Sequence, residues 1–299
     1  MTWNAEILKQ LEFYWDFQFR PRLVGLSDEE YLWEPVEGAW SLRPSGPGGR
    51  LEPEFIRPDP PIPPVTTIAW RAVHIGRDVL GNRARALFGT SSAPEGADMF
   101  DDRHWPEPLP STANDALAML DEAYELWHSG IAALDDAEAL RPIGPLGGPF
   151  AEDSMAALAL HLNREVMAHG AEICLLRDLY RADRDRRDPV VAAALRGDAA
   201  GLAELLGDGT AVVRPTLVAE AAGLHHWAVV RARLAAGVAP DGGSTSALHY
   251  AAGAGELEVV RLLIAHGADV EAVDDRFSLT PAGWAEFFRH KDIADFLAR

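Results

Sequence analysis

The sequence predicts an all-α protein in which a bundle of four long helices is followed by a short array of helical repeats. Two observations support this prediction. Apolar residues recur at helical spacing in four separate stretches, within about 3–24, 66–88, 112–140 and 154–187. From residue 190 onward the chain repeats itself at short intervals. A chain of 299 residues is long enough for two domains of ordinary size, each with its own core.

The first helix and the segment after it follow from local signals. The apolar stripe of residues 3–24 ends near Pro21. Ser27, with Glu30 three residues later, predicts a capping box on a short second helical turn. Residues 35–64 contain too much proline and glycine for a helix, so we expect an ordered, irregular crossover along the surface.

The other three helices are separated by breaks of the same kind. Thr66 or Thr67 can cap the second helix, which runs through Phe88 and precedes an irregular stretch over 89–111. Ser111 or Thr112 starts the third helix, which continues to about Leu140. The fourth helix opens at Asp153 or Ser154 and ends within RADRDRRDP, where Pro189 interrupts any continuation. Four long helices with irregular connections predict a four-helix bundle.

The second half of the chain repeats at the spacing of ankyrin repeats. Four units, aligned on a pair of small residues, recur at spacings of 28, 30 and 34 residues. The third unit, SALHYAAGAGELEVVRLLIAHGAD, resembles the ankyrin pattern nearly throughout, and the first and last units depart from it as terminal repeats do. The resemblance implies paired short helices, a structural role for His249 and a surface that binds a protein partner. We therefore assign residues 1–186 to the bundle and 187–299 to about four ankyrin repeats.

Charge and composition narrow the possible functions. The net charge is -19, from 18 basic and 31 acidic residues in 1–187 and 9 and 15 in 188–299. Because neither half is basic, we expect neither nucleic acid nor an anionic membrane surface as a partner. No stretch approaches 18 uncharged apolar residues and the first residues lack the features of a signal peptide, so a cytoplasmic location is expected. The single cysteine, Cys174, excludes an internal disulfide and is expected to be a buried, inert thiol.

Three candidate metal ligands lie on one stripe of the fourth helix. His161, Glu165 and His169 follow one another at intervals of four residues, a spacing at which neighbours can share one ion. The two histidines are about 12 Å apart along the axis, so an ion has to choose one adjacent pair. His74 on the second helix is the best third ligand. Two histidines and one carboxylate would leave coordination positions open, as in catalytic zinc and non-haem iron sites. The alternative is a polar seam whose side chains only hydrogen-bond to their neighbours.

A resemblance to a known family favours the metal site. The stretches GLSDEEYLWEPVEGAWSLRP, TTIAWRAVHIG and LNREVMAHGAEICLLRDLY resemble the DinB-like superfamily, over roughly residues 1–183. That superfamily also includes thiol-dependent S-transferases and mycothiol-dependent maleylpyruvate isomerases. The resemblance implies a four-helix bundle with a divalent ion, often zinc or nickel, on one histidine of the second helix and an H-x-x-x-H pair on the last. His74 matches the first ligand and His169 the third. Glu165 stands where the family often has the other histidine, and His161 is the reserve ligand.

Two functions remain open at this point. In the first, a metal at His74, Glu165 and His169 activates a thiolate or water for attack on a small electrophilic substrate. The protein would then be a thiol-dependent transferase or a hydrolase, with zinc, nickel or iron as its metal and a low-molecular-weight thiol as a second cofactor. In the second, the bundle is a non-catalytic scaffold with a vestigial site, and the ankyrin repeats bind a protein partner. Only the first function requires bound metal.

Overall fold

The computed structural model describes residues 3–56, 58, 60–89, 92–207 and 214–298. Contacts divide the chain into two units, Met1–Arg181 and Ala182–Arg299. Regular structure among the described residues is almost entirely helical, which confirms the predicted all-α class. The predicted boundary between residues 186 and 187 lies slightly later in the same helix and stays a prediction. No helix in the described ranges is both long enough and apolar enough to cross a membrane.

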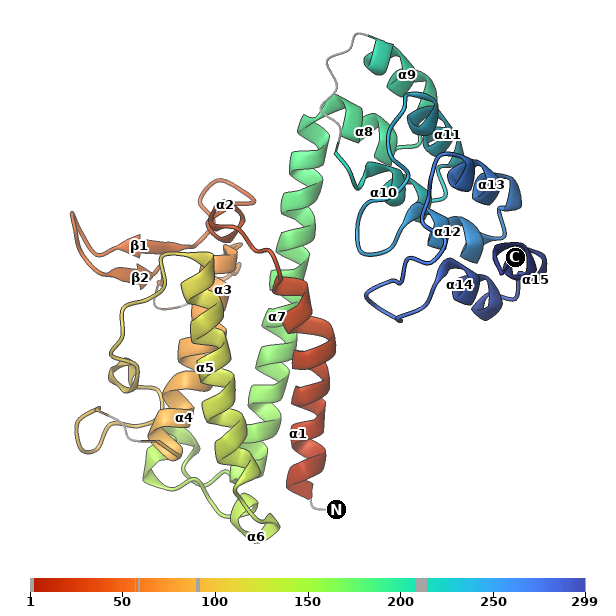
Figure 1. Ribbon diagram of the computed structural model, residues 1–299. Helices are drawn as coiled ribbons and strands as arrows, with labels where there is room; N and C mark the ends of the chain where they lie inside the picture. Colours follow the sequence, from red (N-terminus) through yellow and green to blue (C-terminus); the bar gives the residue numbers. More distant parts are fainter. Residues whose placement is uncertain (1–2, 57, 59, 90–91, 208–213, 299) are drawn as a thin grey trace. The chain divides into compact units, whose positions relative to one another are not determined.

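Four long helical segments build the first unit, and Figure 1 shows them running side by side. The first is α1 (Trp3–Phe13), continued by a π-helix (Tyr14–Phe19) and a 3-10 turn (Arg20–Leu23). The second consists of α3 (Ile68–Val73), a π-helix (His74–Gly81) and α4 (Asn82–Leu87). The third is α5 (Ala113–Ala132) and the fourth is α7 (Met155–Arg187). Their apolar side chains share one core, which confirms the predicted bundle.

Side-chain caps start these helices where the sequence indicates. The side chain of Thr67 accepts a hydrogen bond from the backbone N–H of Trp70, and Thr112 accepts one from Asp115. The third helix is shorter than predicted. It ends at Ala132, because Asp135 caps a separate short helix, α6 (Asp136–Ala139), with its own capping box.

The predicted capping box at Ser27 is only half formed. Ser27 accepts a hydrogen bond from the backbone N–H of Glu30 and starts α2 (Asp28–Tyr31). The carboxylate of Glu30 does not return to the cap. It pairs with Arg177 of α7 through two hydrogen bonds of 2.6 and 2.9 Å. A local signal was therefore overridden by a tertiary ion pair, which ties α2 to α7.

The crossover over residues 35–64 contains one element that the sequence did not predict. Strands β1 (Leu42–Pro44) and β2 (Leu51–Pro53) form an antiparallel hairpin in which Arg43 pairs with Glu52. Trp40 and Thr66 form an isolated bridge that holds the crossover against the start of α3. The rest of the described crossover is irregular, as expected. The hairpin matters for function because it lines the cavity described below.

The second long helix is not α-helical throughout, because a π-helix runs from His74 to Gly81. Two glycines allow close packing there. A Cβ added to Gly76 would lie 2.9 Å from Met119, and one added to Gly81 would overlap the ring of Trp105. Irregular helical turns of this kind are frequent at functional sites. This one begins at the predicted metal ligand His74.

The second unit consists of paired short helices, as ankyrin repeats require. The pairs are α8 (Pro189–Leu195) with α9 (Ala199–Gly207), α10 (Leu217–Gly223) with α11 (Trp227–Ala235), α12 (Ala247–Ala254) with α13 (Leu257–Ala265), and α14 (Pro281–Phe287) with α15 (Lys291–Leu297). The small residues that define the repeat, Ala193, Ala221, Ala251 and Ala285, are all buried. Residues 208 and 209 of the first predicted repeat lie outside the described residues.

His249 has the structural role that its position in the repeat predicts. Its Nε2 lies 3.1 Å from the carbonyl oxygen of Leu279 in the following repeat, and its Nδ1 lies 2.9 Å from Oγ of Ser246. Burial lowers the pKa of His249, although the hydrogen bond with the carbonyl oxygen of Leu279 opposes the shift in part. The ring therefore links two neighbouring repeats and is not a candidate for chemistry.

Candidate metal centre

The fold brings together the three residues that the sequence named as ligands. His74 lies at the start of the π-helix, and Glu165 and His169 lie one turn apart on α7. One ligand atom from each residue lies within 4.8 Å of the other two. Oε2 of Glu165 is 3.3 Å from Nε2 of His169 and 3.9 Å from Nε2 of His74. Two helices far apart in sequence thus direct three metal-binding groups toward one point.

These distances fit a single divalent ion. Donors bound at about 2.1 Å around a tetrahedral ion are roughly 3.4 Å apart, so small side-chain adjustments would bring all three onto one centre. Both imidazoles present Nε2 to Glu165, which is the shared orientation that a common ion requires. All three side chains are partly buried. The residues present therefore suit a site with two nitrogen donors, one oxygen donor and open positions.

The opposite nitrogen of each imidazole faces a carboxylate. Nδ1 of His169 lies 2.8 Å from Oε2 of Glu172, and Nδ1 of His74 lies 3.6 Å from Oδ2 of Asp78. Metal-binding histidines commonly donate their second N–H to such a group, which fixes the ring and its tautomer. Asp78 and Glu172 were not among the predicted site residues. Their positions four residues after His74 and three after His169 could have indicated them, because those spacings place side chains on one helix face.

Two arginines complete this chain of contacts. Arg77 pairs with Asp78 at 2.6 Å, and Arg71 pairs with Glu172 at 2.8 Å. Burial alone would raise the pKa of Asp78, but the hydrogen bond with His74 and the charge of Arg77 outweigh it and hold the pKa below its ordinary value. Asp78 therefore stays an anion that can accept a hydrogen bond from the imidazole of His74.

His161, the reserve ligand, is not part of the group of three. Its Nδ1 lies 3.8 Å from Oε1 of Glu165, the carboxylate oxygen that does not face the other two histidines, and its side chain is 44% exposed. It lines a separate small cavity instead. Cys174 is half-buried, and burial raises the pKa of its thiol, which disfavours a reactive thiolate.

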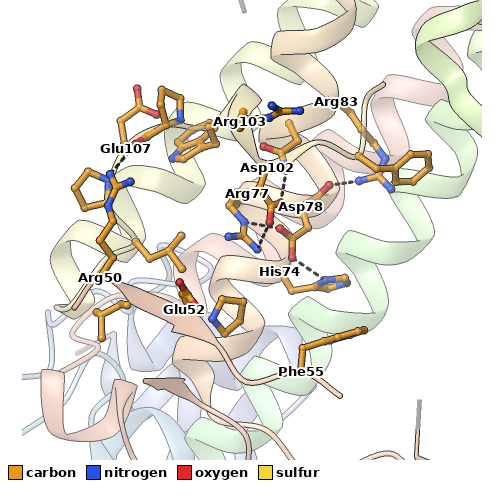
Figure 2. Close-up of a pocket in the computed structure, with 18 of the residues that line it drawn as sticks. Arg50, Glu52, Phe55, His74, Arg77, Asp78, Arg83, Asp102, Arg103 and Glu107 are labelled. Atoms are coloured by element: carbon orange, nitrogen blue, oxygen red, sulfur yellow. Dashed lines mark hydrogen bonds and ion pairs between the residues drawn. The ribbon is translucent and has the colours of Figure 1, made fainter. Parts of the chain in front are cut away.

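A large cavity of about 1010 Å³ reaches the centre through His74. Figure 2 shows His74 at its wall, below the interacting group of Arg77, Asp78 and Asp102, with Phe55 on the opposite side of the ring. Further lining comes from Arg50 and strand β2, from the π-helix, from Asn82 and Arg83 of α4, and from several residues between 92 and 109. Trp70 stacks on His74 with ring centroids 5.4 Å apart, so the imidazole is held by an aromatic face as well as by Asp78. The cavity is of the size that small-molecule sites have.

Comparison with known protein families agrees with the two units. Residues 50–173 match the DinB superfamily, and this range contains His74, Glu165 and His169. Residues 248–298 match ankyrin repeats. No curated protein matches the chain. The chain therefore carries an N-terminal domain of the DinB superfamily followed by C-terminal ankyrin repeats.

Proposed function

We propose that the DinB-like domain binds one divalent metal ion through His74, Glu165 and His169. The ion would activate a thiol or a water molecule for attack on a small electrophilic substrate. The observation that carries this proposal is the meeting of three ligand atoms, from two helices, within 4.8 Å. Domains of this superfamily generally bind metal, which supports the same conclusion. The donor set suits zinc, nickel or iron(II). The proposed activity is that of a thiol-dependent transferase or a hydrolase.

The chemistry would be divided between the ion and the protein. A divalent ion at this centre would lower the pKa of a bound thiol or water, so that a nucleophile is available near neutral pH. Asp78 and Glu172 hold the two imidazoles in the orientation that presents Nε2 inward. The cavity beside His74 has room for a small molecule, and its aromatic side chains, including Phe55 and Trp70, provide an apolar wall against the reacting group. A low-molecular-weight thiol as co-substrate belongs to this proposal.

Elemental analysis of the purified full chain tests the proposal. We expect about one divalent ion per chain after reconstitution with Zn²⁺, Ni²⁺ or Fe²⁺, since the residues that the structure describes contain one such group of three ligands. The variants His74→Ala, Glu165→Ala and His169→Ala should each lose most of the ion. His161→Ala is the matched control, because it removes an imidazole from the same helix stripe but not from the group of three. Metal-free protein, or four variants that all behave like the original, would leave the polar seam as the correct interpretation.

The carboxylates behind the imidazoles supply a second test. We expect Asp78→Asn and Glu172→Gln each to weaken metal affinity by about 10–100-fold, because such outer contacts orient the ligands and increase their basicity. Competition with a chromogenic chelator measures the change. Asp121→Asn is a suitable control, since that carboxylate pairs with Arg20 and belongs to neither histidine. Equal affinities in all these variants would show that the outer carboxylates do not support the centre.

We infer for the second unit that the ankyrin repeats bind a protein partner. Ankyrin repeats generally act in this way, and four stacked helix pairs present an extended surface. Among the described histidines of the repeats, His249 has a structural role, since it links two repeats through the carbonyl oxygen of Leu279. If the metal analysis fails, this partner-binding role with a vestigial bundle site becomes the preferred function. The two roles are compatible if metal is present.

A further inference from the structure

A second, smaller cavity of about 320 Å³ lies in the DinB-like domain between α4 and the beginning of α7. Its walls are mainly apolar and comprise Met99, Phe100, Ile143, Phe150, Ala157 and Leu158. The rings of Phe100 and Phe150 are neighbours, with centroids 6.0 Å apart. The polar lining consists of Arg83, His161, Arg164 and Asp153. An apolar pocket with a few convergent polar groups is the usual form of a small-molecule site.

Arg83 stands out on its helix because no carboxylate of the described residues lies within ion-pair distance of it. The other described arginines from the same long helix are all paired with acids: Arg71 with Glu172, Arg77 with Asp78, and Arg85 with Glu107 and Glu122. Arg83 donates through Nη1 to the backbone oxygen of Asp78, and its buried Nε has no hydrogen-bond partner. In Figure 2 a dashed line joins its guanidinium to Asp78, whose carboxylate is paired with Arg77.

The environment of Arg83 makes an added anion favourable. Burial lowers the pKa of Arg83, and the more distant charges of Asp78 and Glu165 offset this effect only in part. An arginine stays protonated even so, which leaves a half-buried cation with unused donors. Its guanidinium lies over the ring of Phe100, 4.8 Å from the centroid, so it is held at the cavity wall. A bound anion would supply the missing counter-charge and accept the unused N–H groups.

A second cation faces the same cavity from α7. Arg164 is exposed and has no carboxylate partner among the residues that the structure describes, and its Nη2 lies 3.4 Å from Nδ1 of His161. Asp153 is the single acid among the cavity's lining residues, against two arginines and a histidine. The lining is thus cationic in a chain whose net charge is -19. This local reversal of charge is what an anion-binding site requires.

We propose that this cavity binds a small organic carboxylate, with its carboxylate group on Arg83 and Arg164 and an apolar body about the size of one aromatic ring against Phe100 and Phe150. The apolar wall favours an organic acid over an inorganic anion, because an ion such as phosphate would leave that surface unfilled. The volume of about 320 Å³ fits one such molecule and excludes a peptide. None of His74, Glu165 and His169 lines this cavity, so the inference stands whether or not metal is bound.

Calorimetric titration of the full chain with benzoate tests this site, with benzyl alcohol and acetate as matched probes. Benzyl alcohol keeps the ring and removes the charge, and acetate keeps the charge and removes the ring. We expect benzoate to bind at least about tenfold more tightly than either, a difference of ~1.4 kcal/mol. Absence of benzoate binding at millimolar concentration, or equal binding of all three probes, would overturn the proposal.

Variants locate the bound carboxylate. Arg83→Met and Arg164→Met should each weaken benzoate binding by about tenfold or more, since each removes a charged donor. Arg164 is exposed, so its variant is expected to fold even if the Arg83 variant does not. Arg103→Met is the control for the larger cavity, because Arg83 and Phe100 line both cavities whereas Arg103, which pairs with Asp101, lines only the larger one. The double variant His74→Ala, His169→Ala should bind benzoate normally. Loss of binding in that variant would place the carboxylate on the metal ion and refute the assignment to the arginines.

Discussion

Glu30→Ala is expected to destabilise the DinB-like domain by about 3–5 kcal/mol, because it leaves a buried arginine without its counter-charge. The side chains of Glu30 and Arg177 are each 8% exposed. They form a bidentate ion pair, with Nε of Arg177 2.6 Å from Oε1 of Glu30 and Nη2 2.9 Å from Oε2. Arg177 also donates to the backbone oxygens of Arg22 and Val24, so it anchors the end of the first helical segment to α7. Chemical denaturation, with hydrogen exchange to resolve the DinB-like domain, measures the loss.

A neighbouring ion pair provides the control for this prediction. Arg22 and Asp178 connect the same two segments at 2.7 Å, but their side chains are 48% and 52% exposed. Asp178→Ala should therefore cost less than about 1 kcal/mol. The double variant Glu30→Leu, Arg177→Met should recover part of the stability, because it leaves no unpaired charge. If Glu30→Ala and Asp178→Ala have the same small effect, burial does not set the strength of these pairs.

The second large effect is expected in the ankyrin repeats, where Asp274→Ala should cost about 2–4 kcal/mol. Asp274 is 1% exposed. Its Oδ1 accepts hydrogen bonds from the backbone N–H groups of Arg276 and Phe277, and its Oδ2 accepts from Leu279 N–H and Trp284 Nε1. Removing the carboxylate leaves four donors without this acceptor and frees the loop before α14. Hydrogen exchange in peptides of the last repeats measures the change.

The same residue predicts a dependence on pH. Burial by itself would raise the pKa of Asp274, but the hydrogen bonds from Trp284 and the backbone lower it from 3.8 to about 2. A lowered pKa means that the stabilisation is fully present above pH 3.8 and is lost as the pH falls toward 2. The difference between the original chain and Asp274→Ala should shrink over this range. Asp275→Ala, at an exposed neighbouring carboxylate, is the control and should show no such trend.

Much of the candidate metal centre could be predicted from the sequence because two of its three candidate ligands follow helix geometry. Glu165 and His169 are four residues apart, and this spacing alone places them together on α7. His74 required the packing of a second helix, and the family resemblance supplied that information. The choice between Glu165 and His161 could not be made from spacing, since both are one turn from a partner. Packing against His74 directs Oε2 of Glu165 toward Nε2 of both His74 and His169 and leaves His161 at another cavity.

The sequence by itself determined the helices, their caps and the ankyrin array, because these depend on contacts between residues close together in the chain. Thr67, Thr112 and Ser154 start helices through hydrogen bonds to residues three positions later. Tertiary structure alone decided that the Glu30 carboxylate pairs with Arg177 and which residues of the crossover pair as β1 and β2. It also decided which arginines have an acidic partner. The physical reason is that ion pairs and strand pairs join residues distant in sequence. The spacing of residue types along the chain therefore does not predict them. Arg83 looks like its neighbours in the sequence, and only the folded domain shows that it has no acidic partner among the described residues.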